Sequence, residues 1–546
     1  MFEIRLLSSL AKVFPKSAPP ERPEKNWLSA LCNETVSFQI AYKQGDTGWR
    51  NWGELEIDAP DEFKLQARRL CYIPGFIPFN FKTDDGYLKT EGGLFPDLLE
   101  RLDTTRIPLV PGIWQSLWID ITVPQDAKQG LHIIKIKLKT RDGELLGEKA
   151  TNLSIISAEL PPLSIPRTMW FHTDCLAVYY GVKAFSQEHW KIVENFASYA
   201  VQHGINTLLT PIHTPPLDTE VGKERLTVQL IDITAEDEKY IFDFTKLKRW
   251  VDMCKRVGVE YYEIAHLFTQ WGAKHAPKIM GMRNGEYVQL FGWGTEATGD
   301  EYANYLRQML PALTEKLQEW GIAEKTFFHI SDEPGLAQID DYMAARKIVE
   351  PLLEGYKIMD ALSDYDFYKT GAVQVPIPAV DHIEPFLKGD VSELWCYYCC
   401  SQSYKVPNHF FMLPSYRHRI LGVLMYKYNI KGFLQWGYNF YSSMHSVYPI
   451  DPYRVTDGDG AFPSGDPFIV YPGADGKPLA SLRLMVAQEA FADFRALTLL
   501  ETHIGKDAVL ALIDEGLAKP ITFDEFPQNE EYLLQLRLRV NQKLTR

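Results

Sequence analysis

The chain has 546 residues, of which 46% are hydrophobic and 23% are charged. A chain of this length is expected to form about two to four domains, and its composition is that of a globular protein with a large core. The formal net charge of −14 argues against a nucleic-acid partner, which would require a basic surface. No run of about 18 apolar residues occurs, so the sequence predicts no membrane span and no membrane partner.

The seven cysteines of the chain are scattered, and their number is odd. This pattern favours reduced thiols over a disulfide framework. Cys396, Cys399 and Cys400 form a CxxCC run, but no second cysteine pair or HxxxH motif lies near it, so we expect packed thiols rather than a metal site. Glu3 and Arg5 interrupt the apolar N-terminus, so we expect no signal peptide and a cytoplasmic location.

Residues 1–160 have the pattern of a β-sandwich. The segments 35–43, 116–123 and 132–140 alternate apolar and polar side chains with the period of two that is typical of half-buried strands. An Asp-Gly pair follows the third segment and predicts a hairpin. Closely spaced strands without a helical pattern indicate two packed sheets. The proline-rich segment 159–168 is expected to be the linker.

Residues 168–480 alternate predicted strands with predicted helices. Ser186 is the expected N-cap of a helix that ends at Gly204, and a second helix is predicted to end at Gly258. The predicted strands are 168–174, 206–213, 260–268, 325–330, 356–363, 371–381, 393–401 and 432–441. This order predicts a (β/α)8 barrel of the TIM type, and amphipathic helices are expected over 481–546. The expected fold is therefore a multidomain α/β plus β chain, with a sandwich, a barrel and C-terminal helices.

The segment KTFFHISDEPG, residues 325–335, starts as an apolar strand and ends with two adjacent carboxylates, Asp332 and Glu333. Acidic residues favour the first turn of a helix, and Pro334 suits the first helical position, so the pair could simply start a helix. However, the pair follows the fourth predicted strand, and in such barrels the carboxyl ends of the strands carry the chemistry. We therefore interpret Asp332 and Glu333 as candidate catalytic residues.

Polar and aromatic side chains also lie at the ends of other predicted strands. The candidate substrate-binding residues are His172, Asp174, His213, His266, Trp271, Trp395, Tyr397, Gln435, Trp436, Tyr438 and Asn439. Such residues in one cleft are typical of a carbohydrate site, because aromatic rings stack on the apolar face of a sugar. The period of two places Trp436 and Tyr438 on one face of their strand, and Gln435 and Asn439 on the other. The histidines lack HxH or HxxxH spacing, so we expect no metal, and we expect no cofactor.

Two carboxylates in such a cleft suggest glycoside hydrolysis. A conventional retaining enzyme takes its acid and its nucleophile from different strands, about 5 Å apart. Adjacent residues instead suit substrate-assisted hydrolysis, in which the 2-acetamido oxygen of the sugar attacks C1. One carboxylate then orients the acetamido N–H, and its neighbour protonates the leaving oxygen. The motifs GxxxxGK[ST], GxSxG and HExxH, which would indicate other chemistry, are absent.

Several segments together resemble glycoside hydrolase family 123 and its wider relatives with a DUF4091-type domain. They are FFHISDEPG, LWCYY, GFLQWGYNFY and the stretch DGDGAFPSGDPFIVYPG with the PLASLRL that follows it. The resemblance implies a retaining β-N-acetylgalactosaminidase with a β-sandwich before a (β/α)8 barrel. It also implies that Asp332 orients the acetamido group, that Glu333 is the general acid/base, and that Trp436 and Tyr438 form the aromatic wall of the sugar site.

The function expected from the sequence is removal of a terminal β-linked N-acetylhexosamine, GalNAc preferred, from a short glycan or glycoconjugate. The sequence does not indicate an oligomeric state. One alternative is a glycosidase of different sugar specificity, with a conventional pair such as Glu333 with Glu263 or Asp360. Another is a non-catalytic carbohydrate-binding relative, since fold alone does not establish chemistry.

Overall fold

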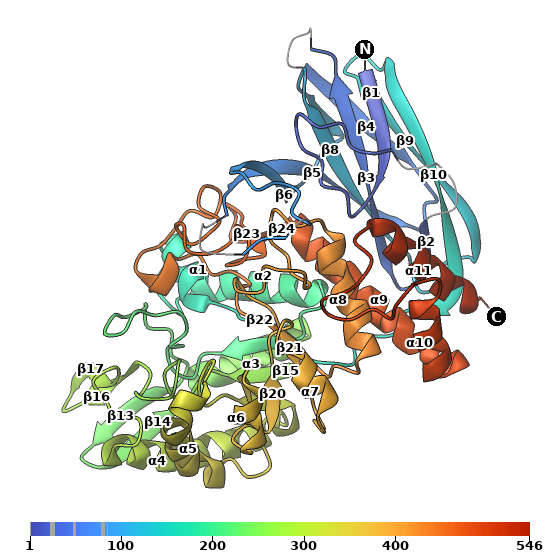
Figure 1. Cartoon of the computed structure of the whole chain (residues 1–546). Coiled ribbons are helices and arrows are strands. Elements are labelled where there is room, and N and C mark those ends of the chain that lie inside the picture. Colours follow the sequence, from blue (N-terminus) through green and yellow to red (C-terminus); the bar gives the residue numbers. More distant parts are fainter. Residues whose placement is uncertain (1, 22–27, 47–50, 78–81, 85, 546) are drawn as a thin grey trace.

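The computed structural model describes residues 2–21, 28–46, 51–77, 82–84 and 86–545 of the chain (Figure 1). Within these residues, two sheets form the N-terminal part. The larger has the strand order β1 (Phe2–Ser8), β3 (Thr35–Gln44), β8 (Trp114–Thr122), β5 (Lys64–Gly75), β6 (Gly93–Arg101), β24 (Pro478–Ser481) and β23 (Val470–Pro472). The smaller has the order β2 (Leu28–Cys32), β10 (Leu145–Glu159), β9 (Gly130–Thr140), β4 (Asn51–Asp58) and β7 (Arg106–Leu109). Neighbouring strands run antiparallel except β2 and β10.

One apolar core joins the two N-terminal sheets. Phe38 and Ile119 of the larger sheet share it with Ile134 and Ile136 of the smaller sheet. In β9 the buried residues alternate with lysines that stay partly exposed, so the period of two in the sequence is the alternation between the core and the solvent. Strands β9 and β10 pair antiparallel across a turn in which Gly143 has a φ of 85°, which confirms the predicted hairpin.

Eight parallel strands form a nearly closed barrel beside these sheets (Figure 1). In chain order they are β11 (Arg167–Met169), β12 (Thr207–Thr210), β15 (Tyr261–Ile264), β18 (Thr326–Phe328), β19 (Lys357–Ala361), β20 (Val375–Ile377), β21 (Cys396–Tyr397) and β22 (Phe433–Gln435). Each strand lies beside the next one along the chain, and β22 pairs with β11. Between β20 and β21 the link is an isolated parallel bridge from Ala379 to Tyr397. The predicted parallel barrel of eight strands is confirmed.

The barrel strands are shorter than the sequence pattern predicted. The segment 168–174 was expected to be one strand, but β11 ends at Met169 and a helix begins at Thr173. The N–H of Trp170 still donates to the Gln435 carbonyl of β22, but the N–H of His172 donates to the Asn439 side chain, so the backbone leaves the sheet there. Polar side chains at the strand ends thus replace the sheet ladder, which a period of two does not reveal.

Helices follow the barrel strands along the chain. They are α1 (Thr173–Tyr180), α2 (Gln187–Gln202), α3 (Thr245–Val257), α4 (Asp300–Glu319), α5 (Ile339–Val349), α6 (Tyr365–Lys369), α7 (Glu384–Lys388), α8 (Tyr416–Lys427), α9 (Leu482–Ile504), α10 (Lys506–Asp514) and α11 (Glu530–Lys543). The Ser186 hydroxyl accepts a hydrogen bond from the N–H of His189, which confirms it as the N-cap of α2. Gly258 ends α3 with a φ of 93°, a conformation that glycine adopts readily.

A small four-stranded sheet at the side of the barrel was not predicted (Figure 1). Its order is β14 (Lys239–Asp243), β13 (Asp232–Glu236), β16 (Ile279–Arg283) and β17 (Glu286–Phe291). The sheet consists of two hairpins: β13 and β14 follow β12 in the chain, and β16 and β17 follow β15. Each strand has only five or six residues, too few for a clear alternation in the sequence.

The C-terminal part of the chain returns to the N-terminal sheets. Strand β23 and all but the last residue of β24 lie within the range predicted for the barrel, yet β24 pairs with β6 and so extends the larger sheet. The boundaries 1–160, 168–480 and 481–546 therefore stay a prediction. All seven cysteines are free thiols. Within the described part of the chain, no helix combines the length and the apolar character that crossing a membrane would require.

Candidate active site

A cavity of about 260 Å³ lies at the carboxyl ends of the barrel strands. Its lining residues are Trp170, Leu217, Asp218, Gln270, Trp271, Asp332, Glu333, Ala361, Tyr397, Cys399, Cys400, Leu434, Trp436, Met444, His445 and Phe462. Most of them end a barrel strand or lie in the segment after it, from β11, β12, β15, β18, β19, β21 and β22. This is the end of a parallel barrel at which catalytic residues are found.

Asp332 and Glu333 lie in the loop that follows β18. Helix α5 begins only at Ile339, after a short 3-10 turn, so neither carboxylate lies in its first turn. The φ of Glu333 is 47°, in the left-handed region that residues with a side chain rarely occupy. The Tyr397 hydroxyl donates a hydrogen bond of 2.6 Å to its Oε1 atom, and the N–H of Trp271 donates to the Asp332 carbonyl at 2.9 Å. The pair is therefore held in the cavity wall and does not start a helix.

The electrostatic environment favours a proton on Asp332. Burial raises the pKa of Asp332 well above its usual range, and the Glu333 carboxyl beside it adds to this effect. The charge on His329 lowers the pKa of Asp332, whereas Asp360 and Asp218 raise it further. Asp332 is half-buried whereas Glu333 is exposed, so burial acts mainly on Asp332. Asp332 is thus the carboxyl group of the pair on which the surroundings favour a proton.

Aromatic side chains form much of the cavity wall. Trp170, Trp271, Trp436 and Tyr397 all line it. Trp271 is 42% exposed and also has a left-handed backbone, with a φ of 58°. The indole N–H of Trp436 donates to Asp466 at 2.9 Å, which holds the ring in place. Flat apolar surfaces held in this way suit the apolar face of a sugar ring.

The structure brings some of the predicted site residues together and leaves others outside. Asp332, Glu333, Trp271, Tyr397 and Trp436 line the cavity. The remaining candidates are absent from its lining, namely His172, Asp174, His213, His266, Trp395, Gln435, Tyr438 and Asn439. Of the predicted substrate-binding residues, the three that line the cavity, Trp271, Tyr397 and Trp436, are all aromatic.

His172 and Asp174 belong to a buried polar cluster behind the wall. The guanidinium of Arg225 donates to both carboxylate oxygens of Asp174, at 2.7 and 2.8 Å, and to Nδ1 of His172 at 3.1 Å. The Nε2–H of His172 donates to the Trp436 carbonyl at 2.8 Å. These residues therefore support the backbone of Trp436 and do not face the cavity.

His213, Trp395 and Tyr438 are packed into the interior. Nε2 of His213 lies 3.0 Å from the hydroxyl of Tyr305. The Tyr438 hydroxyl donates to the Phe196 carbonyl of helix α2, so this ring faces the helices. Trp395 is fully buried. The alternation of Trp436 and Tyr438 was predicted to place both in the site, but β22 ends at Gln435 and the backbone beyond it is no longer a strand.

Gln435 and Asn439 hold backbone segments together. The amide of Gln435 donates to the Asp466 carbonyl at 3.1 Å and accepts from the N–H of Gly437 at 2.7 Å. The amide of Asn439 accepts from the N–H of His172 and donates to its carbonyl. Both side chains use their polar atoms in these bonds and are fully buried.

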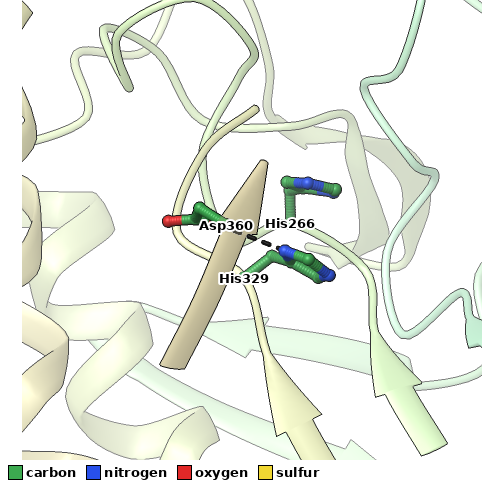
Figure 2. Close-up of side chains that lie close together, drawn as sticks. All are labelled: His266, His329 and Asp360. Carbon is green, nitrogen blue, oxygen red and sulfur yellow. Dashed lines mark hydrogen bonds and ion pairs between the residues drawn. The ribbon is translucent and has the colours of Figure 1, made fainter. Parts of the chain in front are cut away.

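His266 forms a buried group with His329 and Asp360, which Figure 2 shows from close by. Nδ1 of His329 lies 3.1 Å from Asp360, and Nε2 lies 2.7 Å from Glu263. The rings of His266 and His329 are stacked, with centroids 4.3 Å apart and planes at 20°. Because ring nitrogen lone pairs lie in the ring plane, two stacked rings do not direct them at a common ion. The arrangement suits a hydrogen-bonded network better than a metal site.

The sequence analysis missed several lining residues. Trp170 is two residues before His172 in one predicted strand, so the period of two could have pointed to it. Asp218 and His445 come from loops far apart in the chain, and the N–H of His445 donates to Asp218 at 3.0 Å. Nothing in the sequence around either residue marks this contact, because loops show no periodicity.

The family model of the glycoside hydrolase 123 catalytic domain matches residues 170–500. Among solved structures, a family 123 glycoside hydrolase from Clostridium perfringens, described in relation to glycolipid glycan hydrolysis, matches with a TM-score of 0.73 and 15% identity. This match covers 100% of the present chain and 97% of the other one, and at such identity it shows a shared fold.

A weaker structural match is an endo-β-1,4-mannanase from Thermotoga petrophila. Its TM-score is 0.34 at 12% identity, and the match covers 62% of this chain and 77% of that one. The search of curated proteins found no significant match. Because the catalytic-domain model spans more than half of the chain, the protein belongs to glycoside hydrolase family 123.

Proposed function

We propose that the protein removes a terminal β-linked N-acetylhexosamine, GalNAc preferred, by a retaining and substrate-assisted mechanism. Membership of the family indicates a glycosidase that acts on a carbohydrate. The observation that carries the finer proposal is the adjacent pair Asp332 and Glu333 in an aromatic cavity at the carboxyl ends of the barrel strands. An adjacent pair suits a mechanism in which the substrate supplies the nucleophile.

The conventional partners considered from the sequence are poorly placed for this chemistry. Glu263 and Asp360 are fully buried, absent from the cavity lining and hydrogen-bonded to His329. Among the described residues, Asp218 is the one further carboxylate of the lining. A conventional mechanism would therefore pair Asp218 with Glu333, and the experiments below separate that case from substrate assistance.

In the proposed reaction, the Asp332 carboxylate accepts a hydrogen bond from the acetamido N–H. The acetamido carbonyl oxygen attacks C1 as the glycosidic C1–O bond breaks, and Glu333 gives its proton to the leaving oxygen. A bicyclic oxazolinium ion results. Water then attacks C1 and gives a proton to Glu333, the oxazolinium ring opens, and the sugar leaves with retained configuration.

These roles require that Asp332 is ionised while Glu333 holds a proton. A pair that carries one proton has one ionised and one neutral carboxyl group. An acetamido N–H bound at Asp332 favours the arrangement in which Asp332 is ionised and Glu333 holds the proton. The Tyr397 hydroxyl, which donates to Oε1 of Glu333, orients that carboxyl toward the leaving group.

The cavity is small for an oligosaccharide. Its volume of about 260 Å³ lies just below the range of about 300–1,000 Å³ for sites that enclose drug-sized ligands. A volume of this size suits one terminal sugar, with the remainder of the glycan outside. The exposed ring of Trp271 is then available to the sugar that follows.

We also propose that the barrel has the (β/α)8 organisation and that the N-terminal sheets form a β-sandwich. At least one helix follows each barrel strand, which supports a (β/α)8 description. The shared core of the two N-terminal sheets supports a β-sandwich over most of residues 1–160.

A panel of nitrophenyl glycosides tests the function. We expect the highest kcat/KM with the β-N-acetylgalactosaminide, lower values with the β-N-acetylglucosaminide, and no turnover of the β-galactoside, which lacks the acetamido group. A thiazoline analogue of the oxazoline intermediate should inhibit competitively. Equal turnover of the β-galactoside would favour the conventional mechanism through Asp218, and no turnover of any glycoside would favour a binding protein.

A further inference from the structure

Beneath the cavity, an imidazole ring lies between two carboxylates. Glu263 belongs to β15, His329 follows β18 and Asp360 belongs to β19, so the group crosses three adjacent barrel strands. All three side chains are fully buried. Nε2 of His329 lies 2.7 Å from Glu263 and Nδ1 lies 3.1 Å from Asp360. An imidazole that donates from both nitrogens carries a positive charge.

Other donors complete this buried group. Glu263 also accepts from the Thr168 hydroxyl and from the indole N–H of Trp170. Asp360 also accepts from the Tyr342 hydroxyl and from the N–H of Ile330. Although burial alone lowers it, the two carboxylates raise the pKa of His329 to about 10. The three side chains thus form a satisfied network with one internal cation.

The ring of His266, stacked on His329, carries no second charge. Neither of its nitrogens has a hydrogen-bond partner, and it is fully buried. Burial and the neighbouring His329 lower the pKa of His266 well below its usual range. A neutral ring over the face of an imidazolium is a favourable contact, because the π-electrons face the cation.

The network is tied directly to the segment that ends in the carboxylate pair. His329 precedes Asp332 by three residues, and Asp360 accepts from the N–H of Ile330 between them. The carbonyls of His329 and Ile330 accept from the N–H groups of 267–268, and the Ser331 hydroxyl donates to the carbonyl of residue 269 at 2.8 Å. The backbone that presents Asp332 is therefore held on two sides.

We propose that His329 is a positioning residue which, as a buried cation between Glu263 and Asp360, fixes the segment before Asp332 and favours the ionised form of that carboxylate, which holds the acetamido group. The inference rests on the proposed function, since it assigns this role within the substrate-assisted reaction. Without the cation, two buried carboxylates would lie beneath Asp332 and oppose its ionisation.

The charges that act on Asp332 come from several elements. They are Glu333 in the same loop, His329 after β18, Asp360 in β19, and Asp218 in the loop after β12. Among them, His329 is the one that favours the ionised form. A test must therefore remove this cation without changing the number of buried carboxylates.

A single variant and a double variant that differ only at His329 meet this condition when they are compared. Glu263→Gln leaves His329 paired with Asp360 alone. Adding His329→Gln removes the cation and leaves the Asp360 carboxyl in place, where Ile330 and Tyr342 still donate to it. The acid limb of the kcat/KM profile reports the second proton on the Asp332 and Glu333 pair.

We expect the acid limb to lie about one pH unit or more higher in the double variant than in Glu263→Gln, because loss of the cation raises the pKa of Asp332. His203→Gln in the same background is a matched control, since this buried histidine bonds to the Tyr199 carbonyl away from the cavity. Coincident acid limbs in the single and double variants would overturn the proposal.

A spectroscopic measurement does not depend on turnover. In protein with nitrogen-15-labelled histidine, the signal lost in His329→Gln should have the imidazolium shift for both nitrogens at about pH 8, whereas the signal lost in His266→Gln should be neutral. A neutral His329 would overturn the proposal. If the wild-type protein hydrolyses no aryl N-acetylhexosaminide, the proposed function fails, while this spectrum still decides whether the cation exists.

Discussion

Two Asp-Glu pairs of the barrel region are identical in composition but lie in different environments. Asp300 and Glu301 form the first turn of α4, are exposed to solvent, and Glu301 bonds to Arg283 at 2.8 Å. Asp332 is half-buried and Glu333 is exposed, but both line the cavity, and among the described residues no lysine or arginine forms an ion pair with them. The comparison shows that the dipeptide becomes a candidate catalytic pair through its place after a barrel strand and through its lack of a neutralising partner.

The largest expected effect is that of Glu333→Gln on a disaccharide substrate. Without the general acid, kcat should fall by about 10²–10⁴-fold, because an alkoxide is a poor leaving group. An aryl glycoside should lose much less, since nitrophenolate needs little protonation. Steady-state kinetics on both substrates measure the difference. Glu301→Gln, the matched change at the exposed pair, should retain wild-type rates. Equal losses on the two substrates would contradict the assignment of Glu333.

Asp332→Asn should be damaging whatever the leaving group. The variant weakens the orientation of the acetamido group and the stabilisation of its developing positive charge, for which about 10²–10³-fold in kcat is typical of one lost electrostatic contact. The loss should therefore be similar for aryl and disaccharide substrates, unlike that of Glu333→Gln. A rate close to that of the wild type would contradict the assignment of Asp332 as the residue that orients the acetamido group.

Tyr397→Phe should have an intermediate effect. It removes a hydrogen bond of 2.6 Å to the Glu333 carboxyl, which becomes charged as its proton passes to the leaving oxygen, and bonds to a charged group contribute about 1.5–3 kcal/mol. This corresponds to about 10–100-fold in kcat on the disaccharide. Tyr287→Phe, an exposed tyrosine of the small sheet, is the control. An unchanged kcat would mean that Glu333 does not depend on this bond.

The smallest expected effect is that of Trp436→Ala, which removes a stacking surface. A ring contact contributes about 0.5–1.5 kcal/mol beyond burial, so KM should rise by about 2- to 10-fold with a smaller change in kcat. Trp52→Ala changes an exposed tryptophan of the N-terminal sheet and should leave KM unchanged. A KM equal to that of the wild type would exclude Trp436 from the sugar site.

The sequence predicted the parts of the molecule that periodicity governs. The alternation in β9 and the Ser186 cap follow from local patterns a few residues long. The order of the eight parallel strands follows from the succession of such patterns along the chain. The position of Asp332 after the fourth strand followed from this order. The residues at which the strands end were harder to predict from the sequence, because polar side chains such as Asn439 replace the hydrogen bonds of the sheet there.

The walls of the cavity were predicted only in part. Trp271 and Trp436, two of the aromatic residues that were predicted at strand ends, line it. His172 and Asn439 were expected there too, but they form hydrogen bonds with buried partners that are remote in the sequence. Arg225 donates to the His172 ring, and Asn439 accepts from the N–H of His172. The sequence of a single chain contains no local signal for partners of this kind.

The most direct test of substrate assistance is to change the nucleophile itself. Aryl β-N-acetylgalactosaminides can carry one, two or three fluorine atoms on the acetamido methyl group, which makes the carbonyl oxygen progressively less nucleophilic. If this oxygen attacks C1 beside Asp332 and Glu333, kcat/KM should fall steeply with each fluorine atom. If an enzyme carboxylate such as Asp218 attacks instead, kcat/KM should be nearly independent of fluorination, and that result would contradict the account.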